Sequence, residues 1–186
     1  MVNYRRLDAS EIERLQAQMC TASDWNEIEV AEGFSTDYVN NVRFSGKITL
    51  GVFRKEFCLA GGIRKHSGIY HATLHNVTVG DDCLIENISN YIANYTIGRG
   101  AFIENVDIIL TDGPTAFGNG VQVSVLNETG GNEVVIYDRL SAQIAYAMAV
   151  YRCRPELISR LREMAMRYAE SVTSSMGSIG ENVIIV

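Results

Sequence analysis

Two segments eighteen residues apart decide the fold: "NVTVGDDCLIEN" (Asn76–Asn87) and "NYTIGRGAFIEN" (Asn94–Asn105) share Asn, Thr, Gly and an Ile-Glu-Asn ending. Apolar residues recur every six positions around them, at Val79, Ile85, Tyr91, Ile97, Ile103 and Ile109. This period is typical of neither an α-helix nor an alternating strand, but six-residue repeats with glycine at turns are typical of a parallel β-helix. Three such repeats complete one coil. We therefore predict that Ile85 lies under Ile103, and Asn87 under Asn105, in adjacent strands.

The remainder of the chain is organised around these repeats. Asp8 and Glu11 have the spacing of a capping box, which predicts a helix near the N-terminus. Later apolar stripes predict two helices that meet at Pro155. We expect four segments: an N-terminal helical cap and lead-in at 1–41, coils at 42–136, an inserted helical hairpin at 137–175, and a return to the coils at 176–186. The final "VIIV" lies inside a coil, which predicts a solenoid that continues in a longer protein or is covered by a partner subunit.

Composition narrows the possible partners and compartments. The chain has 186 residues and a net charge of −6, which argues against a nucleic-acid partner. Its first residues lack the apolar core of a signal peptide, and no segment reaches transmembrane length. We expect a cytoplasmic protein with no membrane partner. The cysteines show no CxxC spacing, so they are predicted to be reduced thiols.

The six-residue series, with "IG" turns at Ile97-Gly98 and Ile179-Gly180, resembles the hexapeptide-repeat superfamily. The segments "GIYHATLHN", "ENISNYIANYTIG" and "VLNETGGNEVVIYDRLSA" look like a family of long bacterial hexapeptide-repeat proteins without an assigned function. This resemblance implies a mainly β fold, a left-handed parallel β-helix with an N-terminal helical segment and an inserted α-helical hairpin. It also implies a homo-oligomer, a trimer in most members, and an acyltransferase-like activity. The acceptor would be a sugar or nucleotide sugar. No cofactor would be bound, and acyl-CoA or acyl-carrier-protein would be the co-substrate.

All three histidines lie in "KHSGIYHATLHN". Acyl transfer needs a base that takes a proton from the acceptor, and histidine has a pKa suited to this task. We predict His75 as the first candidate for this catalytic role, because it directly precedes the regular coils, and His71 as the second. The alternative is that these histidines are surface side chains bonded to neighbouring backbone.

A metal site is a further, minor alternative. His66 and His71 form HxxxxH, and hexapeptide-repeat carbonic anhydrases use such a pair with a third histidine. Three imidazoles and a water would make a catalytic site. However, no histidine precedes His66, and His75 has the wrong spacing for a third ligand. The prediction for the chain is therefore that it holds no metal.

Polar residues at the corners and register breaks of the repeats are the substrate-binding candidates. Five are selected for this role: Asn76, Asn94, Asp112, Asn127 and Glu128. Asparagines can equally form structural ladders, since Asn tolerates left-handed backbone and stacks between strands. Two hypotheses on function follow. One is an acyltransferase-like enzyme, and the other is a non-catalytic solenoid that binds carbohydrate or nucleotide sugar or serves as an assembly scaffold.

Overall fold

The computed structural model of the chain describes residues 3–125 and 133–186. These residues divide into two compact units. Unit 1 comprises Met1–Asp112 and Met176–Val186, and unit 2 comprises Gly113–Ser175. Both units contain strands, and the protein is mainly β, as the repeats predicted.

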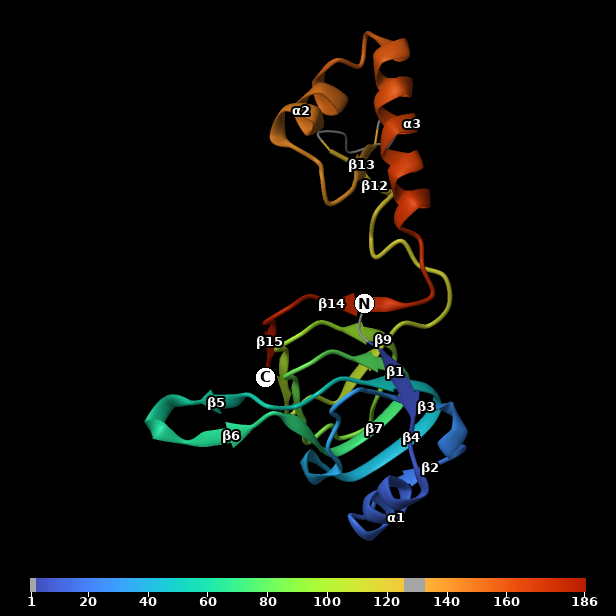
Figure 1. The fold of residues 1–186 in the computed structure, drawn as a ribbon. Coiled ribbons are helices and arrows are strands. Elements are labelled where there is room, and N and C mark those ends of the chain that lie inside the picture. The colour runs from blue at the N-terminus through green and yellow to red at the C-terminus, as the bar shows by residue number, and fades with distance from the viewer. Residues whose placement is uncertain (1–2, 126–132) are drawn as a thin grey trace. The chain divides into compact units, whose positions relative to one another are not determined.

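Unit 1 is built on one eleven-stranded mixed sheet (Figure 1). Its strands are β1 (Tyr4–Arg6), β2 (Thr21–Ala22), β3 (Ile28–Ala31), β4 (Val39–Leu50), β7 (Gly68–Val79), β8 (Leu84–Glu86), β9 (Tyr91–Ile97), β10 (Phe102–Glu104), β11 (Ile108–Leu110), β14 (Gly177–Ile179) and β15 (Ile184–Ile185). A separate antiparallel hairpin joins β5 (Glu56–Cys58) to β6 (Arg64–His66). Short 3-10 turns occupy Trp25–Glu27, Thr36–Tyr38 and Ala60–Gly62.

The parallel pairs of this sheet fall into three ladders, which the chain visits in turn. Ladder A stacks residues 28–30, 48–50, 77–79, 95–97 and 177–179. Ladder B stacks residues 39–40, 69–70, 85–86, 103–104 and, at its end, 185. Ladder C stacks residues 21–22, 43–44, 73–74, 91–92 and 108–109. One circuit of the three ladders therefore returns the chain to the adjacent strand.

The predicted register is confirmed in ladder B, where Ile85 pairs with Ile103. Asn87 likewise donates from its amide to Oδ1 of Asn105 at 3.4 Å. Apolar side chains on these strands point to the interior and are almost fully buried, among them Phe44, Ile48, Leu74, Ile85, Ile92 and Ile103. Each such side chain contributes about 1.5–3 kcal/mol when it leaves water. The six-residue period thus reflects one inward side chain on each face of the coil.

The N-terminal helix α1 (Ala9–Ala17) begins at the predicted capping box. Oδ1 of Asp8 accepts from the Glu11 N–H at 2.8 Å, and Oε2 of Glu11 accepts from the Asp8 N–H at 3.0 Å. The Arg5 guanidinium donates from Nη1 to Oε2 of Glu11 at 2.8 Å and from Nη2 to Oε1 at 2.7 Å. Strands lie on both sides of this helix, β1 before it and β2 after it, so the predicted helical segment 1–41 also contains strands of the sheet.

Unit 2 contains a β-hairpin and two helices. Strands β12 (Val121–Val123) and β13 (Val134–Ile136) pair antiparallel. Helix α2 (Ala142–Val150) is capped by Ser141, and α3 (Pro155–Val172) carries proline in its first turn. A small core including Val135, Met148 and Ala165 joins these elements. The insertion was predicted to start at residue 137, but unit 2 starts at Gly113, because β13 packs into the same core as the helices.

Cys83 is buried between two turns of unit 1, with its thiol 3.1 Å from the Gly98 carbonyl oxygen. Burial raises the pKa of this thiol from 9.0 to about 11. The folded protein therefore holds the proton more tightly than the unfolded chain. The contribution of Cys83 to unfolding free energy is complete below pH 9.0 and is lost as the pH rises toward about 11.

The rise in the pKa of Cys83 from 9.0 to about 11 corresponds to about 2.7 kcal/mol of unfolding free energy. We expect urea unfolding of the wild-type protein to lose roughly that free energy between pH 9 and pH 11 relative to Cys83→Ala. The substitution removes the titrating thiol, and its packing cost is the same at every pH. Parallel pH curves for the two proteins would contradict the assignment.

Candidate functional site

A row of left-handed residues marks the corner where ladder B passes into ladder C. Asn41, His71, Asn87 and Asn105 occupy successive turns there, with φ angles of 51°, 52°, 55° and 56°. Asparagine adopts this conformation readily because its short polar side chain bonds locally. His71 is the one member of this row that is not asparagine, and histidine also adopts left-handed backbone more often than most residues.

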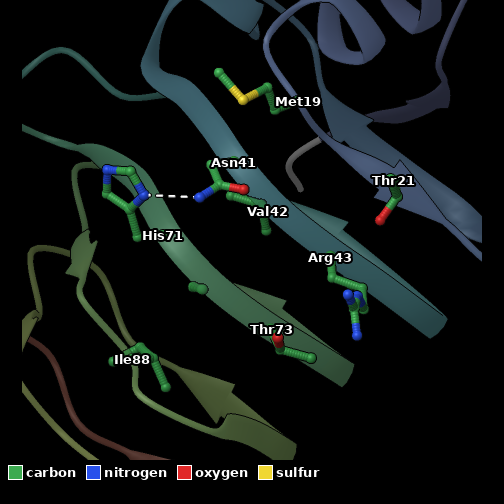
Figure 2. Close-up of a pocket in the computed structure, with 9 residues that line it drawn as sticks. Met19, Thr21, Asn41, Val42, Arg43, His71, Thr73 and Ile88 are labelled. Carbon is green, nitrogen blue, oxygen red and sulfur yellow. Dashed lines mark hydrogen bonds between the residues drawn. The ribbon is translucent and has the colours of Figure 1, made fainter.

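His71 lines a groove beside ladder C that has a cavity volume of about 350 Å³ (Figure 2). Its lining residues are Met19, Thr21, Asn41, Val42, Arg43, His71, Ala72, Thr73 and Ile88. Arg43 on β4 and Thr73 on β7 are register partners and lie next to each other in Figure 2. The walls are therefore formed by strands that are far apart in the sequence.

The groove carries an excess of positive charge. Arg43 is exposed, and its guanidinium forms neither an ion pair nor a hydrogen bond with any residue that the structure describes. The lining residues include no aspartate or glutamate. In a chain of net charge −6, this combination gives the groove a local positive charge.

One nitrogen of the His71 ring has a hydrogen-bond partner among the described residues, and the other has none. Nδ1 lies 2.9 Å from Nδ2 of Asn41, a contact that Figure 2 draws as a dashed line. Within residues 3–125 and 133–186, Nε2 of His71 has no hydrogen-bond partner. With the Asn41 amide as placed, Nδ2–H donates to Nδ1 of His71, so the neutral ring carries its hydrogen on Nε2 and donates toward the groove. Only a turn of the Asn41 amide by 180° would move the hydrogen to Nδ1 and leave the lone pair on Nε2.

His75 has both ring nitrogens engaged. Ser45 Oγ lies 2.8 Å from Nδ1, and Asn76 Nδ2 lies 3.0 Å from Nε2. Asn76 Oδ1 accepts from the Lys47 N–H at 3.0 Å, which fixes the orientation of the Asn76 amide. Asn76 therefore donates to Nε2 of His75, and Nδ1–H of His75 donates to Ser45. His75 is thus part of a satisfied network and has no ring nitrogen open to a ligand.

Asn76 is the centre of this network. Its Nδ2 also donates to Oδ1 of Asn94 at 3.1 Å, and Asn94 donates to the Thr111 carbonyl oxygen at 2.9 Å. Asn76 and Asn94 are left-handed, with φ angles of 51° and 57°. The structure therefore brings His75, Asn76 and Asn94 together at the corner between ladders C and A, where they connect neighbouring turns.

Asn76→Ala is expected to lower the free energy of unfolding by about 2–3 kcal/mol, because it removes three hydrogen bonds and places alanine in left-handed backbone. Asn76→Gly removes the same bonds but tolerates the backbone, so it should be about 1 kcal/mol less damaging. Urea denaturation of both variants measures the two contributions separately. An alanine variant as stable as the wild-type protein would show that the network is not structural.

The other predicted binding residues lie elsewhere. Asp112 is exposed at the end of the first segment of unit 1. Asn127 and Glu128 fall outside the described residues. Sequence reasoning missed Arg43, Thr21 and Thr73, which share the groove with His71. A signal existed, since Arg43 and Thr73 alternate with the inward-facing Phe44 and Leu74 on paired strands.

The three histidine side chains have different hydrogen-bond partners and do not form one site. His66 bonds to the Ser67 carbonyl oxygen, His71 to Asn41, and His75 to Ser45 and Asn76. In the part of the chain that the structure describes, no three His, Cys, Asp or Glu side chains are grouped to hold a metal ion. A three-histidine site is therefore not assembled from His66, His71 and His75.

Together, the fold and groove define a mainly β protein that stacks parallel strands and presents a polar, locally cationic groove on one ladder. The chain belongs to the family described as "Domain of unknown function (DUF4954)", whose model matches residues 4–186. The predicted membership of a hexapeptide-repeat family is wrong, since the matching family is DUF4954 and no hexapeptide-repeat family matches. The misleading signal was the six-residue period, which reports the geometry of stacked turns and not ancestry.

An uncharacterized protein of Treponema pallidum (strain Nichols) is 25% identical over 193 residues, which cover 98% of this chain and 26% of the relative. The chain thus spans about a quarter of that relative's length. No solved structure matches the chain. No helix within the described ranges is long and apolar enough to cross a membrane.

Proposed function

We propose that unit 1 is a binding module for a small anionic carbohydrate derivative, of the nucleotide-sugar class, which it holds in the groove at Arg43 and His71. The single observation that carries this proposal is the unpaired Arg43 guanidinium in a groove without carboxylates. Arginine donates two parallel hydrogen bonds to a phosphate, which makes it well suited to a phosphorylated ligand.

The other lining groups suit the sugar part of such a ligand. The hydroxyls of Thr21 and Thr73 can donate to and accept from sugar hydroxyls. The Met19 and Ile88 side chains offer apolar contact for a sugar face. The volume of about 350 Å³ lies at the lower end of the range for ligand sites, which is about 300–1,000 Å³.

Acyl transfer is the second candidate function, and the Asn41–His71 contact is the observation that favours it. With the Asn41 amide turned so that its oxygen accepts from Nδ1–H, the open Nε2 of His71 has the arrangement of a general base. In this reaction an acceptor hydroxyl oxygen attacks the carbonyl carbon of an acyl-CoA or acyl-carrier-protein thioester. The carbon–sulfur bond breaks, and the hydroxyl proton passes to Nε2 of His71 and then to the departing thiolate. His71 replaces His75 as the preferred base.

We further propose that the stacked turns of unit 1 form a left-handed parallel β-helix. The eighteen-residue spacing between paired strands and the left-handed asparagines at the corners support this geometry. An experimentally determined structure of the chain tests the handedness directly, and a right-handed coil would overturn it.

Calorimetric titration of the protein with UDP-glucose tests the binding proposal. UDP, glucose, inorganic phosphate and acetyl-CoA serve as comparison ligands at the same ionic strength. We expect saturable binding of UDP-glucose that weakens as salt is added, and weaker binding of glucose, which lacks the phosphate. No saturable binding of any nucleotide sugar would overturn the proposal. Release of free thiol from acetyl-CoA in the presence of UDP-glucose would support the second candidate, and its absence would remove it.

A further inference from the structure

A second, separate cleft lies beside β6 of the β5–β6 hairpin. This hairpin projects from unit 1 in Figure 1. The hairpin is fixed to ladder B by two ion pairs and one aromatic contact. Nζ of Lys65 donates to Oε2 of Glu86 at 2.6 Å and to Oε1 of Glu104 at 2.5 Å. The Phe57 ring meets the Phe102 ring edge-on, with 5.3 Å between centroids. These contacts hold the end of β6 over the strands of ladder B.

The cleft has a volume of about 200 Å³ and is lined by Lys65, His66, Tyr70, Leu84 and Glu86. It shares no lining residue with the groove at Arg43. The function proposed for the groove does not use any residue of this cleft.

The hydrogen bond of Nδ1 determines which ring nitrogen of His66 carries the hydrogen. Nδ1 lies 2.7 Å from the Ser67 carbonyl oxygen, which can only accept, so Nδ1 carries a hydrogen. In the neutral ring Nε2 then holds the lone pair, and it has no hydrogen-bond partner among the described residues. The Tyr38 ring stacks on the imidazole, with centroids 3.7 Å apart and an interplanar angle of 11°. His66 is thus a fixed acceptor beside the cleft.

The remaining groups give the cleft an acceptor character. Lys65 is a single cation shared between two carboxylates, Glu86 and Glu104. Burial, with a smaller effect of the Glu86 charge, raises the pKa of the Tyr70 hydroxyl, which stays neutral and can accept a hydrogen bond. Nε2 of His66, the Glu86 carboxylate and the Tyr70 oxygen therefore supply three acceptors around one small space.

We propose that this cleft binds a small molecule carrying a primary ammonium group. An ammonium has three N–H donors, which matches the three acceptors, and it would share the Glu86 carboxylate with Lys65. The Tyr70 ring that lines the cleft favours a cation further. An ionised carboxylate ligand has no hydrogen to donate to these acceptors.

Nuclear magnetic resonance of the histidine ring nitrogens tests this proposal on the whole chain. The probe is ethanolamine at neutral pH, with ethylene glycol as the uncharged comparison and acetate as the anionic one. We expect the Nδ1–H tautomer for free His66, and a saturable shift of its Nε2 signal with ethanolamine alone. An Nε2–H tautomer, equal shifts with ethylene glycol, or no shift of the His66 signals would overturn the proposal.

Variants add an independent measurement. His66→Phe keeps a flat ring against Tyr38 but removes the acceptor, and should weaken ethanolamine binding about tenfold. Glu86→Gln should weaken it by a similar factor, whereas Glu13→Gln, a matched change on the exposed side of α1, should not. Thermal melting establishes that each variant is folded. Unchanged ethanolamine affinity in folded His66→Phe would contradict the assignment, whatever the outcome at the Arg43 groove.

Discussion

Gly98→Ala is expected to lower the free energy of unfolding by about 3 kcal/mol, at the upper end of the range for overpacking a close-packed interior. Gly98 lies at the corner after ladder A, where the backbone of the next turn approaches closely. A Cβ at this position would lie 2.7 Å from the Gly180 carbonyl carbon and 2.8 Å from the Glu181 nitrogen. Both are backbone atoms and cannot rotate away, so adjacent turns would have to separate.

Gly180 provides a matched control, because it occupies the equivalent corner one turn later. A Cβ on Gly180 would meet only Cγ2 of Val183, at an ordinary 3.7 Å. Gly180→Ala should therefore change stability by less than about 0.5 kcal/mol. Thermal unfolding of both variants measures the difference, and we expect a melting temperature about 6–12 °C lower for Gly98→Ala. Equal melting temperatures would show that the turns are not packed as closely as the structure has them.

Arg43→Gln is expected to weaken the binding of UDP-glucose by about 10- to 100-fold. Hydrogen bonds to charged groups contribute about 1.5–3 kcal/mol, and each 1.4 kcal/mol is a tenfold change in affinity. Glutamine keeps a polar side chain but removes the charge and the forked donors that match a phosphate. Because Arg43 has no partner among the described residues, its loss should leave the stability of the fold nearly unchanged.

Arg14→Gln is the matched control for this substitution. Arg14 is an exposed arginine on α1 and does not line the groove. Arg14→Gln changes the net charge of the protein by the same amount as Arg43→Gln. Titration of both variants with UDP-glucose then separates a local contact from a general electrostatic effect. Similar affinities for the two variants would count against Arg43 as the phosphate-binding residue.

The regular turns of unit 1 could be predicted from the sequence because they repeat. Ile85 and Ile103 occupy the same place in successive turns, and each must be apolar for the same reason, so the period carries the register. The start of unit 2 could not be predicted in this way. Residues of the β12–β13 hairpin join the helical core through non-local packing, which leaves no period in the sequence.

The candidate site was harder to predict, since its chemistry depends on hydrogen bonds between turns. His75 was preferred for its position before the repeats, yet Ser45 and Asn76 occupy both of its ring nitrogens. Arg43 lies thirty residues before its register partner Thr73, because the β5–β6 hairpin lengthens that turn. The two residues therefore showed no eighteen-residue repeat, and only the folded chain reveals that they share a groove.

The central claim is that the groove beside ladder C holds a nucleotide sugar against Arg43 and His71. A crystal structure of the chain grown with UDP-glucose tests it most directly. We predict density for the ligand in the groove, with phosphate oxygens at hydrogen-bonding distance from the Arg43 guanidinium and a sugar hydroxyl facing Nε2 of His71. Density for the ligand elsewhere on the protein, or an empty groove at saturating UDP-glucose, would contradict the claim.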